Sequence, residues 1–233
     1  PVSGAGRRKV LFVGEAPSKQ ADAHGLPFGD DSGKFLRQIL RRLDFDIESD
    51  GWQTNAIICR PNGRGPSGAE VGFCRPNLTR AIRDLQPYVI VPIGQAAVTA
   101  VVGGMQGREG VGEIAKWAGW RIPCQALNAW ICPTWSVDAL YIKSRDRNER
   151  EIDPVMEKQF TKHIAAAVGM YGRPWPDGPP DWGQEVRKVL DTAKAARWLR
   201  NVSQRDVGAI AWDYETNMLK PDGPDAQIVT CSV

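Results

Sequence analysis

The sequence predicts an α/β protein in which a central parallel sheet is covered by helices on both faces, a three-layer α/β/α arrangement. Four short segments rich in β-branched residues and bounded by Gly, Pro or Asn have the composition of buried strands: residues 9–14, 54–59, 88–94 and 129–134. Segments with helical spacing of apolar residues lie between them. Near-continuous apolar strands that alternate with helices are typical of parallel sheets buried on both faces.

The helices are predicted from apolar periodicity and from capping residues. Residues 33–43 carry apolar side chains at helical spacing, and Ser32 directly before them is a candidate N-cap. Three further helical segments are expected at residues 69–85, 94–103 and 154–170. The polar stretch that follows the first strand, before the Pro27-Phe28 pair, is expected to be a loop.

A change of composition divides the chain into three parts. Residues 1–170 hold the predicted sheet, residues 171–183 form a linker rich in Pro and Gly, and residues 184–233 begin a second domain. This second domain has one amphipathic helix and two strands, at 207–217 and 228–233. A helix and a two-stranded ribbon cannot close a core, so we expect it to be incomplete here. The first residue is Pro and not Met, which favours a trimmed chain.

Composition and charge are those of an ordinary globular protein, with 42% hydrophobic and 24% charged residues. The net charge of +3 is small, so an anionic partner must be met by a local basic patch. No apolar run reaches the length of about 18 residues that a membrane span requires. Five scattered cysteines do not suggest a disulfide framework, and a cytoplasmic location is expected.

Candidate site residues lie where the predicted strands meet loops. Glu15 and Ala16 follow the first strand, Asn55 lies at the second, and Trp135 and Ser136 follow the fourth. Ligands of open parallel sheets bind beyond the carboxyl ends of the strands, so these side chains are expected around one pocket.

The residue types at this pocket suit a planar nucleobase. Phe28, between turn-forming residues in "GLPFG", is expected to present its ring for stacking. The amide of Asn55 offers a donor and an acceptor side by side, which fits the O4/N3–H edge of uracil. Structural alternatives remain open: Glu15 as a loop cap, Phe28 as a core residue, and Asn55 as a turn residue.

Four segments together resemble the iron–sulfur uracil-DNA glycosylases, family 4 of that superfamily: "VLFVGEAPSKQADAHGLPFGDDSGKFL", "TNAIICRPNGRGPSGAEVGFC", "QPYVIVPIGQAA" and "ICPTW". The resemblance covers about residues 9–168. It implies a domain that extrudes a base from DNA, with Glu15 and Ala16 in the first motif, Phe28 as the stacking ring and Asn55 as the base reader.

Two departures from the family pattern bear on activity. The acidic loop after the first motif is largely replaced by Ser18-Lys19-Gln20-Ala21-Asp22, and the late His-Pro motif by Trp135-Ser136-Val137. Loss of an oxyanion donor costs about 100- to 1000-fold in rate. We therefore expect a base-binding domain with weak or no uracil excision. One alternative is an active glycosylase in which Glu15 or Asp22 positions water, and another is a docking domain without DNA contact.

Two cysteines match part of the family's cluster ligands. Cys59 and Cys74 correspond to two of the four thiolates that would hold a 4Fe–4S cluster. The other two belong to a Cys-x-x-Cys pair upstream of the first strand, and this chain either starts too late to hold that pair or lacks it. Cys124 and Cys132 are expected to be buried in the sheet.

The last part of the chain carries a second resemblance. "AIAWDYETN" resembles the first motif of DnaQ-like 3′–5′ exonucleases, in which Asp213 and Glu215 leave the same face of a strand. Such carboxylates bind Mg²⁺ or Mn²⁺ for phosphodiester cleavage. The flanking pattern resembles the proofreading domain of phage family A DNA polymerases. The resemblance thus implies the N-terminal piece of a polymerase, with DNA and the remainder of that polypeptide as partners; surface acids are the alternative.

Overall fold

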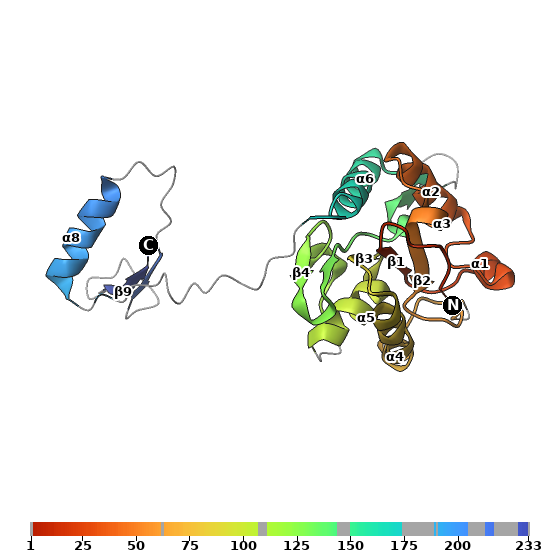
Figure 1. The fold of residues 1–233 in the computed structure, drawn as a ribbon, viewed down its shortest axis with the longest axis horizontal. Helices are drawn as coiled ribbons and strands as arrows, with labels where there is room; N and C mark the ends of the chain where they lie inside the picture. The colour runs from red at the N-terminus through yellow and green to blue at the C-terminus, as the bar shows by residue number, and fades with distance from the viewer. Residues whose placement is uncertain are drawn as a thin grey trace. The chain divides into compact units, whose positions relative to one another are not determined.

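A computed structural model of the chain describes residues 2–61, 63–106, 111–143, 150–173, 189, 191–204, 213–216 and 228–232. The chain divides into two compact units, residues 1–178 and 179–233. The larger unit holds the five-stranded sheet (Figure 1).

The sheet of the larger unit has five strands in the order β2-β1-β3-β5-β4. Its strands are β1 (Val10–Gly14), β2 (Gly51–Asn55), β3 (Val89–Pro92), β4 (Ile122–Cys124) and β5 (Ala129–Ile131). Four of them pair in parallel, as the sequence predicts. The edge strand β4 is antiparallel to β5 and was not predicted, because three residues are too few to show a periodicity.

Helices cover both faces of this sheet, and this confirms the α/β architecture (Figure 1). Helices α2 (Asp31–Arg42) and α6 (Pro154–Val168) pack on one face, and α4 (Gly68–Leu85) and α5 (Gln95–Gln106) on the other. Strand β1 shows that both faces of the sheet are buried. Val10 and Phe12 belong to the first core, Leu11 and Val13 to the second, and all four are fully buried.

Strand β2 corrects one predicted boundary. The apolar run at residues 54–59 predicts the strand, but β2 spans Gly51–Asn55 and pairs residue by residue with β1. The predicted pattern fails because Gln53 is fully buried in β2. Its side chain donates to Glu48 and accepts from Arg37, which removes the cost of burying an amide. Asn55 therefore stands at the end of its strand and not near the start.

Two helix starts also differ from the predictions. The expected loop after the first strand contains helix α1 (Lys19–His24), capped by the Ser18 hydroxyl, which accepts from the Ala21 amide at 3.1 Å. Helix α2 is capped by Asp30, which accepts from the Gly33 amide at 3.0 Å, so Ser32 is inside the helix. Asp30 is the stronger cap because its side chain is anionic at the positive helix end.

Shorter elements complete the larger unit: α3 (Ile47–Asp50), η1 (Ile114–Lys116), η2 (Gln125–Leu127), η3 (Val137–Leu140), β6 (Tyr141–Lys143) and β7 (Arg150–Ile152). Strands β6 and β7 form an antiparallel hairpin. In the part of the chain that the structure describes, no helix has the length and hydropathy to cross a membrane.

The smaller unit is described in three segments. Helix α8 (Thr192–Ser203) is capped by Asp191, and strands β8 (Asp213–Thr216) and β9 (Ile228–Ser232) pair antiparallel. Asp213 and Glu215 lie two residues apart on β8. Most of the predicted linker, residues 174–183, lies outside the described residues.

Candidate functional site: a pocket at the carboxyl edge of the sheet

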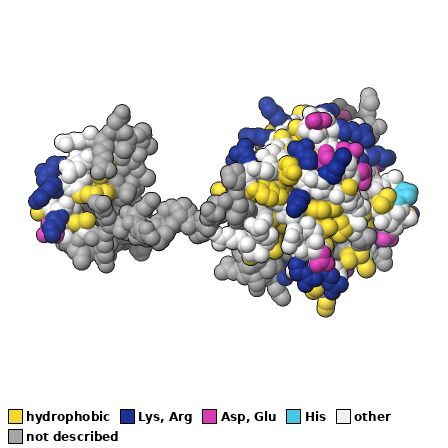
Figure 2. All heavy atoms as spheres, viewed as in Figure 1, with side chains coloured by type: hydrophobic (Ala, Val, Ile, Leu, Met, Phe, Trp, Pro, Cys, Tyr) yellow, Lys and Arg dark blue, Asp and Glu magenta, His cyan; other side chains and the backbone are white. Residues whose placement is uncertain are grey.

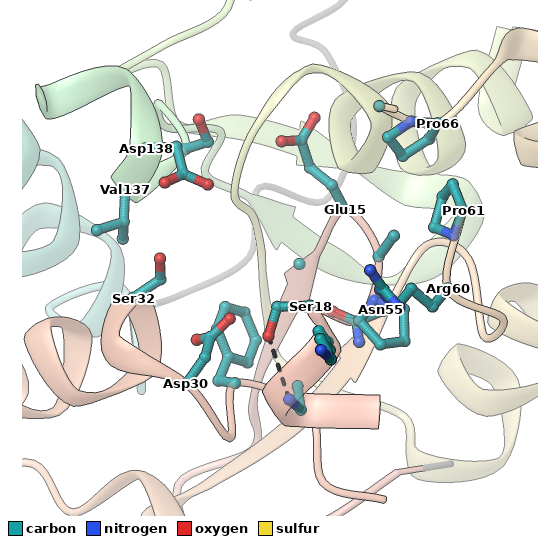
Figure 3. A pocket seen from close by; sticks show the side chains of 18 of the residues that line it. Glu15, Ser18, Asp30, Ser32, Asn55, Arg60, Pro61, Pro66, Val137 and Asp138 are labelled. Atoms are coloured by element: carbon teal, nitrogen blue, oxygen red, sulfur yellow. Dashed lines mark hydrogen bonds between the residues drawn. The ribbon is translucent and has the colours of Figure 1, made fainter. Parts of the chain in front are cut away.

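A pocket with a volume of about 520 Å³ opens at the carboxyl ends of β1 and β2. Figure 3 shows that its side chains come from separate stretches of the chain. They belong to the segment after β1, the start of α2, the end of β2, the loop before α4, and the segment around η3. Of the predicted residues, Glu15, Ala16, Phe28, Asn55 and Ser136 all line it.

Glu15 is held at the start of helix α5. Its Oε1 accepts a hydrogen bond from the Ala96 amide at 2.9 Å. Gly94, at φ +96°, leaves room for this carboxylate, because a Cβ there would overlap the Glu15 side chain. Burial raises the pKa of Glu15 and the charge of Asp138 adds to the rise, while the Ala96 hydrogen bond opposes it. The protonated form of Glu15 is thus favoured more than that of an ordinary surface glutamate.

Asn55 and Phe28 approach each other across Gly14. A Cβ on Gly14 would overlap Asn55 Oδ1 and would lie 3.0 Å from Phe28 Cζ. The glycine that ends β1 therefore lets an amide and an aromatic ring come together at the pocket floor. Phe28 is only 9% exposed and belongs to the core beside α2 and α6, so it is less open than the sequence predicts.

The backbone around Phe28 is held in an uncommon conformation. Phe28 has φ +53°, and its carbonyl accepts from Arg37 Nη1 at 2.8 Å. Gly33 packs directly under this carbonyl, where a Cβ would overlap it. The guanidinium of Arg37 also pairs with Glu48, at 2.8 Å. A positive φ in a bulky residue persists only where its surroundings fix it, and Arg37 supplies that support.

Asp138 is a pocket residue that the sequence analysis missed. It lies in η3 and is exposed at the pocket margin, and its carboxylate and that of Glu15 lie along one side of the opening (Figure 3). Ser136 caps η3 by accepting from the Ala139 amide at 3.3 Å. A lone Asp has no distinguishing spacing. The signal that could have found it is its position two residues after Ser136, on the same short turn.

Basic residues also line the pocket. Lys19, Arg60 and Arg64 all border it, and Arg60 lies beside Asn55 in Figure 3. Arg64 makes a bidentate pair with Glu70, at 2.8 Å for each contact, and this pair together with hydrogen bonds from Ser67 lowers the pKa of Glu70 to about 2. Glu70 in turn completes the capping box of α4 with Ser67.

Two predicted site residues, Asp22 for catalysis and Trp135 for the base, lie outside the pocket, as does the histidine of α6. Asp22 is exposed on α1 and Trp135 packs against the core, and neither lines the pocket. His163 of α6 contacts the Thr134 hydroxyl through Nδ1 at 3.1 Å, and burial lowers its pKa. No histidine lines the pocket among the residues that the structure describes.

The cysteines do not form a cluster site in the described ranges. Cys59 is exposed, Cys74 is half-buried, and Cys124 and Cys132 are buried in the sheet as predicted. Burial raises the pKa of Cys132 to about 12, which is the opposite of what a thiolate ligand needs. Among the described residues, no three His, Cys, Asp or Glu side chains are grouped as a metal would require. The donor set present here does not fit a 4Fe–4S cluster.

Comparison with known proteins agrees with this geometry. The family model "Uracil DNA glycosylase superfamily" matches residues 1–158. Similar proteins include the type-4 uracil-DNA glycosylase of Saccharolobus solfataricus, 31% identical over 177 residues, which cover 74% of this chain and 81% of that protein. That of Pyrobaculum aerophilum is 33% identical over 66% of this chain and 80% of its own length. That of Archaeoglobus fulgidus is 39% identical over 41% of this chain and 49% of its own length. The chain therefore belongs to the uracil-DNA glycosylase superfamily.

Proposed function

We propose that residues 1–170 bind DNA and accept an extruded base in the pocket, with uracil excision that is weak or absent. The observation that carries this proposal is the convergence of Glu15, Phe28 and Asn55 on one pocket at the sheet edge. The relatives described above are type-4 uracil-DNA glycosylases, which supports a base as the ligand. In this role Phe28 stacks on the base, Asn55 reads its edge and Ala16 borders it.

We expect weak excision because the residues Trp135-Ser136-Val137 replace the family's His-Pro motif. Uracil departs as an anion, and its negative charge needs a hydrogen-bond donor in the pocket. No histidine stands at this motif: Ser136 offers only a neutral hydroxyl, which also caps η3, Trp135 packs half-buried against the core, and Asp138 lines the pocket margin. We therefore expect uracil release at least about 100-fold slower than for an enzyme with that donor.

The experiment measures binding and excision on the same oligonucleotides. A duplex with one 2′-fluorodeoxyuridine, which resists hydrolysis, should bind more tightly than the same duplex with thymidine. A matched duplex with deoxyuridine should release little free uracil. Asn55→Asp should shift binding towards cytosine, because an ionised carboxylate only accepts hydrogen bonds, so it repels uracil O4 but can accept from the N4 amino group of cytosine. Rapid uracil release would instead support the alternative of an active glycosylase.

The dependence of binding affinity on salt concentration tests whether the domain contacts DNA. Lys19 and Arg60 border the pocket and are suited to neighbouring phosphates. Figure 2 shows Lys and Arg side chains at several separate places on the face in view. Affinity should fall with salt at a slope set by those contacts. No binding at low salt would favour the third reading, a docking domain that does not touch DNA.

The smaller unit supports a second proposal. We infer that Asp213 and Glu215, two residues apart on β8, are the first acidic motif of a 3′–5′ exonuclease-like domain within a phage-like DNA polymerase. Two carboxylates alone bind divalent metals weakly. Calorimetric titration with Mn²⁺ should detect a weak site that D213N with E215Q removes. Unchanged Mn²⁺ binding in the double variant would support the alternative that these two residues are surface acids.

The visible absorbance of the purified protein tests for an iron–sulfur cluster. Cys59 and Cys74 supply two thiolates, and 4Fe–4S clusters are held by four. Anaerobically purified protein is expected to lack the broad absorbance near about 400 nm that thiolate-bound iron gives. A brown protein with that absorbance would show that this pair has further ligands.

A further inference from the structure

We propose that the exposed face of helix α4 binds single-stranded DNA, with an unpaired base stacked on the ring of Phe73 and phosphates at the arginines of this face. The site shares no lining residue with the base pocket described above. It adds a second contact for DNA, and it rests on the proposed function only in that the chain binds DNA.

A groove of about 370 Å³ lies along the outer face of α4. A Cβ added at Gly72 would have open space around it. Gly72 and Pro76 lie one helical turn apart and carry no long side chain, so the longer side chains stand around a hollow. The lining residues follow helical spacing along this helix: Gly72, Arg75, Pro76, Thr79, Arg80 and Arg83.

Phe73 lies beside this groove. It comes three residues before Pro76 and seven before Arg80, so these residues share one face of the helix. Phe73 is 84% exposed, the highest value among the large apolar residues that the structure describes. Leu78, on the buried side of the same helix, is only 4% exposed. Phe73 is therefore not part of the packing of α4 on the sheet, and its ring is open to a ligand.

The cations of this face are available to an anion. Arg80 is exposed and makes no ion pair within the described ranges. Arg75 Nη2 donates to the Thr99 carbonyl over a long 3.4 Å, and its buried Nε has no partner in the described part of the chain. Turning this guanidinium towards a phosphate therefore breaks only one weak contact. Arg83 pairs with Asp84 at 3.0 Å, but the pair is exposed and contributes little.

An exposed aromatic ring among guanidinium groups favours a single strand over a duplex. The bases of a duplex stack on one another, so none has a face free for Phe73. An unpaired base has such a face, and stacking on an aromatic side chain tolerates any base. Guanidinium groups bind the phosphates on either side. An acidic protein is the competing occupant, because it would match the charge of this face.

The groove also lies next to the base pocket along the chain. The loop before α4 lines that pocket through Arg60 and Pro66, and Ser67 then caps the helix. At a rise of 1.5 Å per residue, Phe73 lies about 9 Å along the helix axis from Ser67. A strand that leaves the pocket thus has only a short distance to cover. Figure 2 shows a group of Lys and Arg side chains in the region where Figure 1 shows α4 and α5.

The test uses the whole chain and two oligonucleotides of about 12 nucleotides. One consists of thymidine, and the other of abasic linkers that keep the phosphates but carry no base. Fluorescence anisotropy gives the two affinities at several salt concentrations. The variants are Phe73→Ala and Arg80→Gln. Their controls are Trp120→Ala, another exposed aromatic residue, and Arg41→Gln, an exposed arginine of α2, and neither control residue lines the pocket or the groove.

We expect the wild-type chain to bind the thymidine oligonucleotide more tightly than the abasic one. F73A should reduce the ratio of these two affinities at least about fivefold, because a stacked base loses its partner. It should leave the salt slope unchanged, since the ring carries no charge. R80Q should lower the slope of log K against log salt by about 0.7, the value for one phosphate contact on a single strand. W120A and R41Q should keep both quantities.

An unchanged affinity ratio in F73A, or equal salt slopes for R80Q and R41Q, would overturn the inference. Polyglutamate that binds as tightly as the thymidine oligonucleotide, and that F73A weakens equally, would overturn it in favour of an acidic protein. The pocket is tested separately with the 2′-fluorodeoxyuridine duplex, whose preference over thymidine should persist in F73A. Absence of that preference in the wild-type chain, with binding of the thymidine oligonucleotide still sensitive to F73A, would overturn the pocket proposal alone.

Discussion

The carboxylate of Glu15 accepts a hydrogen bond from the backbone amide of Ala96 at 2.9 Å, although the two residues lie 81 positions apart in the chain. This contact joins the end of β1 to the start of α5 and fixes the acid at the rim of the sheet. It also places a half-buried carboxylate near Asp138, whose charge opposes ionisation of Glu15.

Glu15→Gln should stabilise the fold at neutral pH. The pKa of Glu15 is raised by burial, so the folded chain holds this proton more tightly than the unfolded chain. The stabilisation that this proton provides is fully present below the ordinary pKa of a glutamate. It is lost as the pH rises through the pKa that Glu15 has in the folded chain. The urea midpoint of E15Q should therefore exceed that of wild type at neutral pH, and the two should converge in acid. A midpoint difference that does not depend on pH would contradict this assignment.

Gly94→Ala should be costly because it acts on Glu15 as well as on the backbone. Gly94 has φ +96°, and a Cβ there would overlap the Glu15 carboxylate. Gly25→Ala is the matched control, because Gly25 has φ +65° with nothing within 4 Å of the added Cβ. The control should lose about 1 kcal/mol of unfolding free energy, and G94A at least about 1–3 kcal/mol more. Equal losses in urea unfolding would show that Glu15 moves aside freely.

Arg37→Met should loosen the Phe28 segment. The guanidinium donates to the Phe28 carbonyl at 2.8 Å and to Gln53 Oε1 at 3.2 Å. Without it a strained turn and a buried amide lose partners, and we expect a loss of about 2–3 kcal/mol in unfolding free energy. Arg41→Met, an exposed position on the same helix, should change it by less than about 0.5 kcal/mol. Near-equal unfolding curves for R37M and R41M would contradict this role.

The layers and the core could be predicted from the sequence because apolar strands and amphipathic helices have clear periods. Asn55 was expected at the pocket and lines it, yet its strand boundary was wrong, since the burial of Gln53 depends on hydrogen bonds to Arg37 and Glu48 that the apolar pattern does not reveal. Asp138 was not predicted at the pocket that it lines, and Trp135 was predicted at the pocket but does not line it. Both differences have the same cause. A short turn after a strand has no periodicity, so only the fold decides which of its side chains enters the pocket.

Arg60→Ala should weaken DNA binding uniformly and reduce its salt dependence. Arg60 borders the pocket beside Asn55 (Figure 3). In the proposed complex a phosphate next to an extruded base would pass at this position. Loss of one phosphate contact should lower the slope of log K against log salt by about 1. Arg42→Ala, an exposed residue at the far end of α2, is the control and should keep the slope. The two slopes, measured by fluorescence anisotropy, should differ; if they agree, Arg60 does not contact the backbone.

Ser136→His should create uracil excision where little exists. Ser136 lines the pocket, whereas Trp135 is packed against the core and would present a new side chain poorly. An imidazole at residue 136 could donate to the developing uracil anion, a contact worth about 100- to 1000-fold in rate. The neighbouring Asp138 opposes that anion, so S136H combined with D138N should exceed S136H alone.

The readout for these two variants is free uracil released from a duplex in single-turnover conditions. Ser136→Asn is the control, because it keeps a side chain that can cap η3 but cannot supply an imidazole. We expect release in the order S136H with D138N, then S136H, then S136N and wild type together. If wild type already releases uracil as fast as S136H does, the pocket has a donor for the leaving group without a histidine, and the chain excises uracil by itself.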